Sequence, residues 1–196
     1  MRIEYDMKRT MKMAAVAFAA AVVLSAATAY LPMYFAVPRF LYANFIPSAL
    51  MAVVCGPVSG AVYAFLISLI LNNIGMGSGA MLNTLLIQAA EAICIGLVLH
   101  RQQWRKRKLR ICVSVLGLAA FDAVALKILS YSLYFLFHIQ SMREKKFLQY
   151  VAENFTFYLK SGLKPAFGTA IFSITAAYVI GNLIIGLTGF RTRKTA

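Results

Sequence analysis

Residues 165–190 read PAFGTAIFSITAAYVIGNLIIGLTGF and carry no charged side chain. A helix needs about 20 consecutive apolar residues to cross the roughly 30 Å of hydrocarbon in a bilayer, so this run is long enough to span a membrane. Four other stretches also lack charge, and they occupy residues 13–38, 40–90, 111–121 and 128–142. None of them shows the two-residue alternation of a membrane barrel strand. The sequence therefore predicts an all-α membrane protein.

The composition excludes a soluble globular protein. The chain has 196 residues, of which 61% are hydrophobic and 13% are charged, and its mean hydropathy is +0.75. Soluble domains are about 45–50% apolar and about 25% charged. The net charge of +14 would indicate nucleic-acid binding in a soluble protein. Here the charges lie between apolar runs, where they hold topology against anionic lipid headgroups, so we expect no nucleic-acid partner.

Turn-forming residues divide the long run 40–90 into three helices. The breaks are Gly56-Pro57 and the glycine-rich stretch 72–79. With the other runs this gives one bundle of six transmembrane helices over residues 13–190. The predicted helices are Met13–Val37, Leu41–Cys55, Val58–Ile74, Ala80–Leu99, Ile111–Phe137 and Ala166–Phe190.

The basic residues predict the orientation of this bundle. Thirteen of the 20 Lys and Arg residues lie in the N-terminal segment 1–12, the loop 100–110 and the tail 191–196. Six others fall on the opposite side, and Lys127 lies inside a helix. Because cytoplasmic segments are enriched in Lys and Arg, both termini are predicted to be cytoplasmic. Ala27-Thr28-Ala29 fits a signal-peptidase site, but cleavage there would remove one helix and break the even count.

The outer segment 139–164 has the pattern of an amphipathic helix. Its apolar residues recur at helical spacing, and most of its charged residues lie elsewhere. We expect it to lie on the outer surface or to extend the last helix. Lys160 and Lys164 favour an anionic ligand on that side, although outer charges can also be merely tolerated.

The sequence contains little material for catalysis. Its three cysteines have no CxxC spacing and its two histidines belong to no motif. The signatures GxxxxGK[ST], GxSxG and HExxH are absent. We therefore predict no enzymatic activity, no metal site and no cofactor.

Polar and ionisable residues within the apolar helices are candidates for ligand binding, because such groups are costly in a membrane and usually face the bundle interior. The candidates are Asn72, Asn73, Asn83, Gln88, Glu91, Lys127, Tyr131, Tyr134, Tyr158 and Lys160. Simpler roles also fit several of them. The amides near residue 72 can cap a helix, the tyrosines can form an interfacial belt, and Lys127 can pair with Asp122 or Glu91.

The first predicted helix carries small residues four apart. Ala15 is followed by Ala19, and Ala17 by Ala21. This spacing lets a second helix approach closely in a membrane. The second helix can belong to this chain or to a partner.

These features together resemble the substrate-binding (S) subunits of energy-coupling factor (ECF) transporters. The resemblance rests on the six-helix layout, the alanine-rich first helix, the Gly-Pro-x-x-Gly-Ala sequence from Gly56 and the Glu-Ala-x-x-x-Gly-Leu-x-Leu sequence from Glu91. It implies a receptor in the bacterial cytoplasmic membrane that binds a vitamin or related micronutrient from outside. It also implies that Ala15 and Ala19 meet a transmembrane coupling subunit, which carries two ABC ATPases. The segments 38–43 and 74–79 would gate the ligand.

Two other interpretations remain at the level of sequence. The chain is similar in size and spacing to the bacterial rod-shape scaffold MreD, which organises cell-wall proteins. Its third predicted helix also resembles those of membrane sensor domains in some histidine kinases, although no kinase or output domain follows within the 196 residues.

Overall fold

The computed structural model describes residues 7–34, 45–73, 81–100, 108–139 and 146–188, and all regular structure in these ranges is helical. The all-α prediction is therefore confirmed for the described residues. The elements are α1 (Met7–Tyr34), α2 (Ile46–Cys55), α3 (Pro57–Asn73), α4 (Met81–Ile95), η2 (Gly96–His100), α5 (Lys108–Phe121), η3 (Asp122–Leu126), α6 (Lys127–Tyr134), η4 (Phe135–Ile139), α7 (Phe147–Ser161) and α8 (Leu163–Leu187), of which η2, η3 and η4 are π-helical.

Among the described residues, three helical stretches are long and apolar enough to cross a membrane. They are Thr10–Thr28, Leu109–Phe137 and Leu163–Leu187. The other apolar helices are shorter, and the ten residues of α2 cover only about 15 Å at 1.5 Å per residue. The predicted end of the first helix at Val37 and the predicted start of the second at Leu41 lie outside the described residues.

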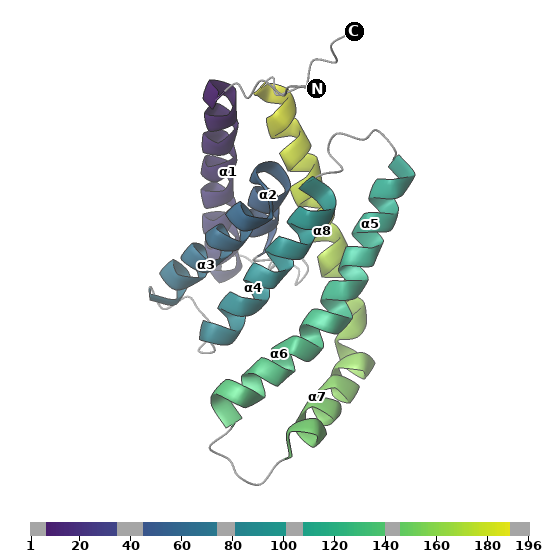
Figure 1. Cartoon of the computed structure of the whole chain (residues 1–196). Helices are drawn as coiled ribbons and strands as arrows, with labels where there is room; N and C mark the ends of the chain where they lie inside the picture. The colour runs from purple at the N-terminus through teal and green to yellow at the C-terminus, as the bar shows by residue number, and fades with distance from the viewer. Residues whose placement is uncertain (1–6, 35–44, 74–80, 101–107, 140–145, 189–196) are drawn as a thin grey trace.

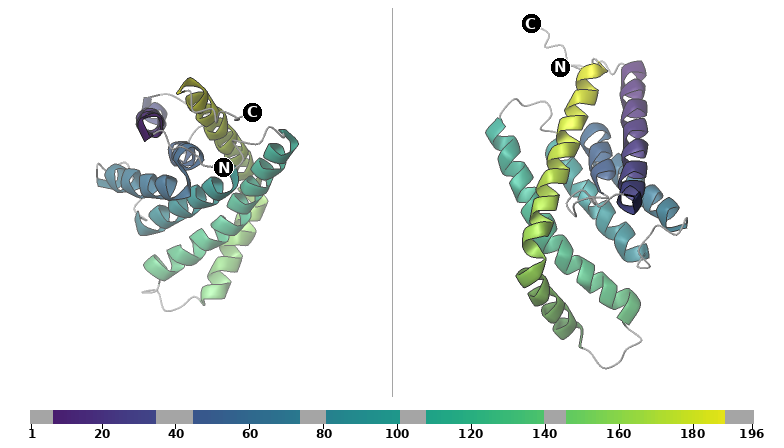
Figure 2. Two further views of the ribbon diagram at one scale, coloured as in Figure 1. Left: turned by 45° about the horizontal axis from the view of Figure 1, so that its top comes forward. Right: turned by 180° about the vertical axis from the view of Figure 1, so that it is seen from behind.

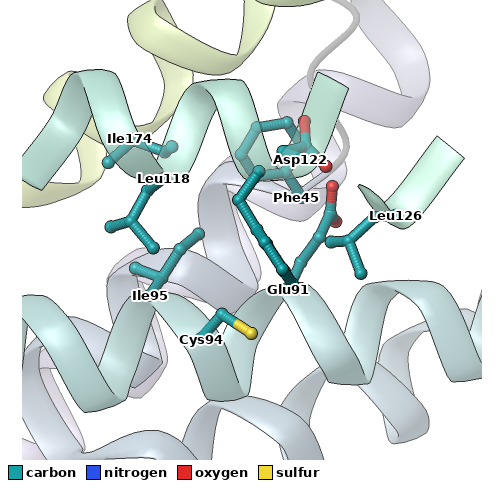
Figure 3. Close-up of a pocket in the computed structure, with 9 residues that line it drawn as sticks. Phe45, Glu91, Cys94, Ile95, Leu118, Asp122, Leu126 and Ile174 are labelled. Carbon is teal, nitrogen blue, oxygen red and sulfur yellow. The ribbon is translucent and has the colours of Figure 1, made fainter. Parts of the chain in front are cut away.

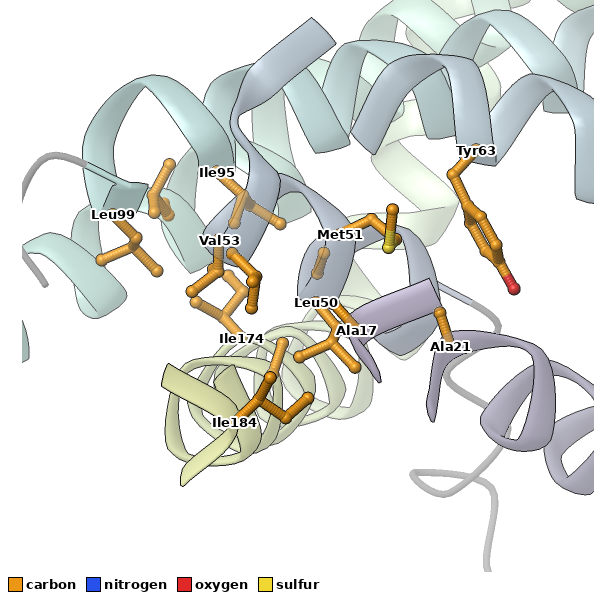
Figure 4. Packing of buried hydrophobic residues seen from close by; sticks show 14 of the residues in the cluster. Ala17, Ala21, Leu50, Met51, Val53, Tyr63, Ile95, Leu99, Ile174 and Ile184 are labelled. Atoms are coloured by element: carbon orange, nitrogen blue, oxygen red, sulfur yellow. The ribbon is translucent and has the colours of Figure 1, made fainter. Parts of the chain in front are cut away.

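The short helix α2 lies at the centre of the molecule. Nine of its ten residues are buried, and it packs against α1, α3, α4 and α8. Side chains from these helices converge on Leu50 and Val53 (Figure 4). The residues around the whole circumference of α2 are apolar or small. A helix without a polar face is typically buried on all sides, which explains why α2 is enclosed.

Two glycines permit the close packing of α3 against α2 and η2. A Cβ atom added to Gly60 in α3 would lie 2.4 Å from the Cβ of Ala52 in α2, and one added to Gly96 would lie 2.5 Å from the Cα of Pro57. At Gly56, φ is +101°, a value that L side chains rarely adopt. Pro57 then begins α3, where its missing N–H is not needed.

One face of α1 packs against the rest of the chain. Ala17 and Ala21 are completely buried, and they line the core beside α2 (Figure 4). One turn further on, the hydroxyl of Ser25 shares a hydrogen bond of 2.9 Å with that of Tyr63 in α3. Ala17 and Ala21 therefore serve contacts within the chain.

The basic segments 1–12, 100–110 and 191–196 adjoin described helices. The helix termini nearest to these segments lie at the same end of the molecule. Figures 1 and 2 show the start of α1 and the end of α8 side by side at this end, where α5 also begins. The other end is formed by α6 and α7, which lie next to each other beyond the remaining helices. Between α5 and α6 the chain bends at η3 (Figure 1), as is common where a π-helical segment interrupts an α-helix.

Candidate functional site

A small cavity lies where α4 meets the bend between α5 and α6. Its walls come from α4, α5, η3 and α8, and from Phe45, which precedes α2 (Figure 3). The enclosed free volume is about 10 Å³, which is room for about one water molecule. The lining residues are Phe45, Glu91, Cys94, Ile95, Leu118, Phe121, Asp122, Leu126 and Ile174.

Two carboxyl groups face each other in this otherwise apolar cavity. Glu91 of α4 is only 9% exposed, and its side chain is hydrogen-bonded to that of Asp122. Figure 3 shows both carboxyl groups pointing toward one another. A hydrogen bond between two carboxyl groups requires a proton on one of them. Asp122 is not among the predicted ligand residues, although its charge in an apolar run distinguishes it in the sequence.

The π-helical segment η3 positions Asp122 for this contact. Asp122 is its first residue, and η3 packs against α4, α5, α6 and α8. The wider turn of a π-helix changes the direction in which the following side chains point, and such segments are frequent at functional sites. The regular helix predicted over Ile111–Phe137 is therefore interrupted at a chemically important residue.

Lys127 has a different environment. Its ammonium nitrogen lies 5.3 Å from the ring centroid of Tyr131 and 5.3 Å from that of Tyr158, distances typical of cation–π contacts. The ion pair between Lys127 and Asp122, an alternative left open by the sequence, is not the arrangement found. Asp122 contacts Glu91, and Lys127 contacts two tyrosines from α6 and α7.

Tyr158 connects α7 to η3. Its side chain is buried, and its hydroxyl donates a hydrogen bond of 2.8 Å to the carbonyl oxygen of Ala123. Burial and the negative charge of Asp122 raise the pKa of Tyr158 to about 12. The phenol therefore remains a neutral hydrogen-bond donor over the whole physiological range.

Replacing Tyr158 with phenylalanine is expected to remove this hydrogen bond and to lower the free energy of unfolding by about 1 kcal/mol near neutral pH. The wild-type pKa is higher in the folded state than the unfolded value of about 10. The wild type therefore loses stability as the pH rises from about 10 to about 12, and its advantage over Tyr158→Phe should shrink in that window. Thermal unfolding of both proteins across this range measures the effect. A constant difference from pH 8 to 12 would contradict it.

The structure places the other predicted ligand residues apart from this region or outside its described part. Gln88 accepts a hydrogen bond from the hydroxyl of Ser68 and so joins α4 to α3. Tyr134 is 37% exposed, and Lys160 is exposed on α7. The side chains of Asn72, Asn73 and Asn83 lie outside the described part of the chain, as do the proposed gating segments 38–43 and 74–79.

The apolar residues that form the walls of the cavity could not be identified from the sequence. Phe45, Phe121 and Cys94 line it, but nothing in their sequence context distinguishes them from other apolar residues. Phe45 is the first described residue after the segment 35–44.

Comparison of this chain with protein-family models, with curated proteins and with solved structures finds no match.

Proposed function

We propose that this chain is the substrate-binding membrane subunit of an ECF-type ABC importer. In this proposal six helices cross the bacterial cytoplasmic membrane, with both termini in the cytoplasm. The chain binds a vitamin or related micronutrient from outside, and a coupling subunit with two ABC ATPases drives its release inside. The polar cluster of Glu91, Asp122 and Lys127 lies along the path of the ligand.

The observation that carries this proposal is the division of α1 into two faces. Ala17 and Ala21 are fully buried against the chain's own helices. Ala15 and Ala19 are exposed, although they have the same spacing. Ala15 and Ala19 are two small residues, one turn apart, that the described part of the chain leaves uncovered between the larger exposed side chains of Phe18 and Val22, and such positions give a partner helix room to approach closely. Ala15 and Ala19 are the two residues that the resemblance assigns to the coupling subunit.

The positions of the helix ends also support the proposal. The described residues nearest to the basic segments 1–12, 100–110 and 191–196 lie at the same end of the molecule (Figure 1). This agrees with a cytoplasmic side that carries thirteen of the 20 Lys and Arg residues.

Purification of the chain from its native host, followed by mass spectrometry of bound small molecules and of copurifying proteins, tests the proposal. We expect a specific metabolite and an ABC ATPase module. If the chain carried no metabolite and copurified with cell-wall proteins, the scaffold interpretation would replace this one.

Substitutions on the two faces of α1 should have opposite consequences. Ala15→Phe and Ala19→Phe together are expected to leave folding and ligand binding intact but to reduce ligand uptake at least about tenfold, because the bulky rings prevent close helix contact. The matched variant Ala17→Phe, two residues after Ala15, should instead destabilise the chain by about 3 kcal/mol or more, because it overfills a closed core. Uptake in whole cells and size-exclusion chromatography of the purified variants distinguish the two effects. Unchanged uptake by the Ala15/Ala19 variant would refute the partner contact.

A further inference from the structure

The feature that the proposed function leaves unexplained is the ammonium group of Lys127. It lies over the faces of Tyr131 and Tyr158, 5.3 Å from each ring centroid. The two rings come from different helices, α6 and α7, so the ammonium group is held at the seam between them. Its side chain is half-buried. A flexible lysine is thus confined to one place.

Among the residues that the structure describes, no carboxylate balances the charge of this group. In the same described ranges, no ion pair joins Lys127 to Asp or Glu. The nearest acidic residue in the sequence, Asp122, is hydrogen-bonded to Glu91. Two tyrosine faces attract a cation only partially, and a desolvated charge strongly favours a partner of opposite sign. An anionic group is the missing partner.

The surrounding side chains are fixed in position before any anion binds. The hydroxyl of Tyr158 donates to the carbonyl of Ala123 at 2.8 Å, so the ring that covers Lys127 on one side cannot turn away freely. Tyr150 on α7 packs against Phe135, with ring centroids 5.4 Å apart. These contacts hold α7 against η3 and η4, the segments that precede and follow α6. Such preorganisation reduces the entropic cost of binding.

Lys127 is also close to the side from which the ligand would come. Lys127 lies eighteen residues after Leu109, which is the first residue of a stretch long and apolar enough to span a membrane. Eighteen residues correspond to about 27 Å along a helix. The hydrocarbon layer is about 30 Å thick. In the orientation of the proposed function, Lys127 therefore lies in the half of the stretch Leu109–Phe137 that is nearer to the outer side, from which an anion would approach.

We propose that Lys127, clamped between Tyr131 and Tyr158, binds a carboxylate or phosphate group of the ligand. This inference rests on the proposed function for the direction of ligand access. It assigns anion recognition to the half-buried Lys127, whereas the sequence alone points to Lys160 and Lys164. Of these two, Lys160 is exposed on α7, where water and salt would weaken its attraction for an anion.

Benzoate and benzamide are suitable probes, because they differ only in replacing a carboxylate with a neutral amide. The purified full chain, in nanodiscs of phosphatidylcholine and at constant ionic strength, is heated with increasing amounts of either compound or of inorganic phosphate. We expect benzoate and phosphate to raise the unfolding temperature and benzamide to have little effect. Lys127→Met should raise the half-saturating benzoate concentration at least about tenfold. Lys127→Arg should retain most of the binding, and the control Lys146→Met, an exposed lysine at the start of α7, should match the wild type.

Three results would overturn the inference. They are equal stabilisation by benzoate and benzamide, unchanged benzoate binding by Lys127→Met, and no stabilisation of the wild type by either anion. If Lys127→Met does not fold, Lys127→Arg and Lys146→Met still test the inference. Loss of benzoate binding in Lys127→Arg, with binding retained in Lys146→Met, would contradict recognition of the anion by charge.

Nanodiscs that contain phosphatidylglycerol distinguish a soluble ligand from a lipid headgroup. If this lipid stabilises the wild type but not Lys127→Met, and benzoate then adds nothing, the anion is a lipid phosphate and the ligand assignment is overturned. The test uses the isolated chain, so its outcome is independent of transport. If Lys127→Met loses anion binding but the wild-type chain copurifies with no ABC partner, only the proposed function is refuted. If the wild-type chain copurifies with an ABC partner but Lys127→Met binds the anion as well as the wild type does, only this inference is refuted.

Discussion

Replacing Gly60 with alanine is expected to destabilise the chain by about 3 kcal/mol or more. The added methyl group would lie 2.4 Å from the Cβ of Ala52 and 2.7 Å from its Cα. Both are atoms of a central helix, so the clash cannot be relieved by rotating a side chain, and α2 and α3 must separate. Overpacking in cores typically costs about 1–3 kcal/mol, and the rigidity of these atoms places Gly60→Ala at or beyond the upper limit. Thermal unfolding and size-exclusion chromatography of the purified variant measure the loss.

Gly117 provides the matched control for this prediction. It lies within α5, and a Cβ added there meets no atom within 4 Å. Gly117→Ala should therefore stabilise the chain by up to about 1 kcal/mol, the difference in helix propensity between alanine and glycine. Equal effects of the two substitutions would show that the contact between Gly60 and Ala52 does not limit helix approach.

Removal of one member of the carboxyl pair should produce the second large effect. In Asp122→Leu, the carboxyl group of Glu91 remains 9% exposed or less but loses its hydrogen-bond partner. A buried polar group without a partner costs about 1–3 kcal/mol. Glu91→Gln keeps the shape of the side chain and can still hydrogen-bond to Asp122, so its free energy of unfolding should change by less than about 0.5 kcal/mol.

The double variant Glu91→Leu with Asp122→Leu determines whether the pair is needed for function. It leaves no polar group in the apolar cavity, so it should be more stable than Asp122→Leu alone, because replacing both partners is often nearly neutral. A double-mutant cycle on unfolding free energies would give a coupling of about 1–3 kcal/mol. Strict additivity of the two substitutions would contradict a direct contact. If the folded double variant still transported its ligand, the pair would be purely structural.

The sequence predicts the helices well because a membrane imposes a simple rule on composition. A run of apolar residues without charge has few alternatives to a helix when backbone groups must be satisfied internally. Runs near residues 58–74 and 166–190 therefore correspond to α3 and α8 with ends shifted by a few residues. The same rule says nothing about which helices cover the membrane's full thickness. The enclosed position of the ten-residue α2 depends on contacts with α8, which follows it by more than one hundred residues.

The faces of α1 illustrate a second limit. Ala15 and Ala17 are the same residue type, two positions apart in a run of small and apolar residues. No periodicity in hydrophobicity identifies the inner face of such a helix, because nearly all of its residues are apolar. The structure identifies it through neighbours that are distant in sequence, among them Leu50 and Tyr63.

The candidate site was predictable only in part. Glu91 and Lys127 stand out because charged groups are rare in apolar helices. Their partners could not be inferred, because the π-helical segment at Asp122 changes the angular relation between residues on either side of it. In a regular helix, Lys127 could still have paired with Asp122. In the structure, Asp122 is hydrogen-bonded to Glu91, and Lys127 makes cation–π contacts with two tyrosines.

The central position of α2 has a consequence for biogenesis. A segment of ten residues is too short to be recognised alone by the insertion machinery, so we expect Ile46–Asn73 to enter the bilayer as a single hairpin. Its apolar surface remains exposed until α8, which is synthesised after all the other described helices, packs against it. Ribosome-bound chains that stop before Leu163 should therefore be sensitive to proteases and chaperones in the region of α2. Protection should arise only when α8 has emerged, so the core closes only after α8 has been made.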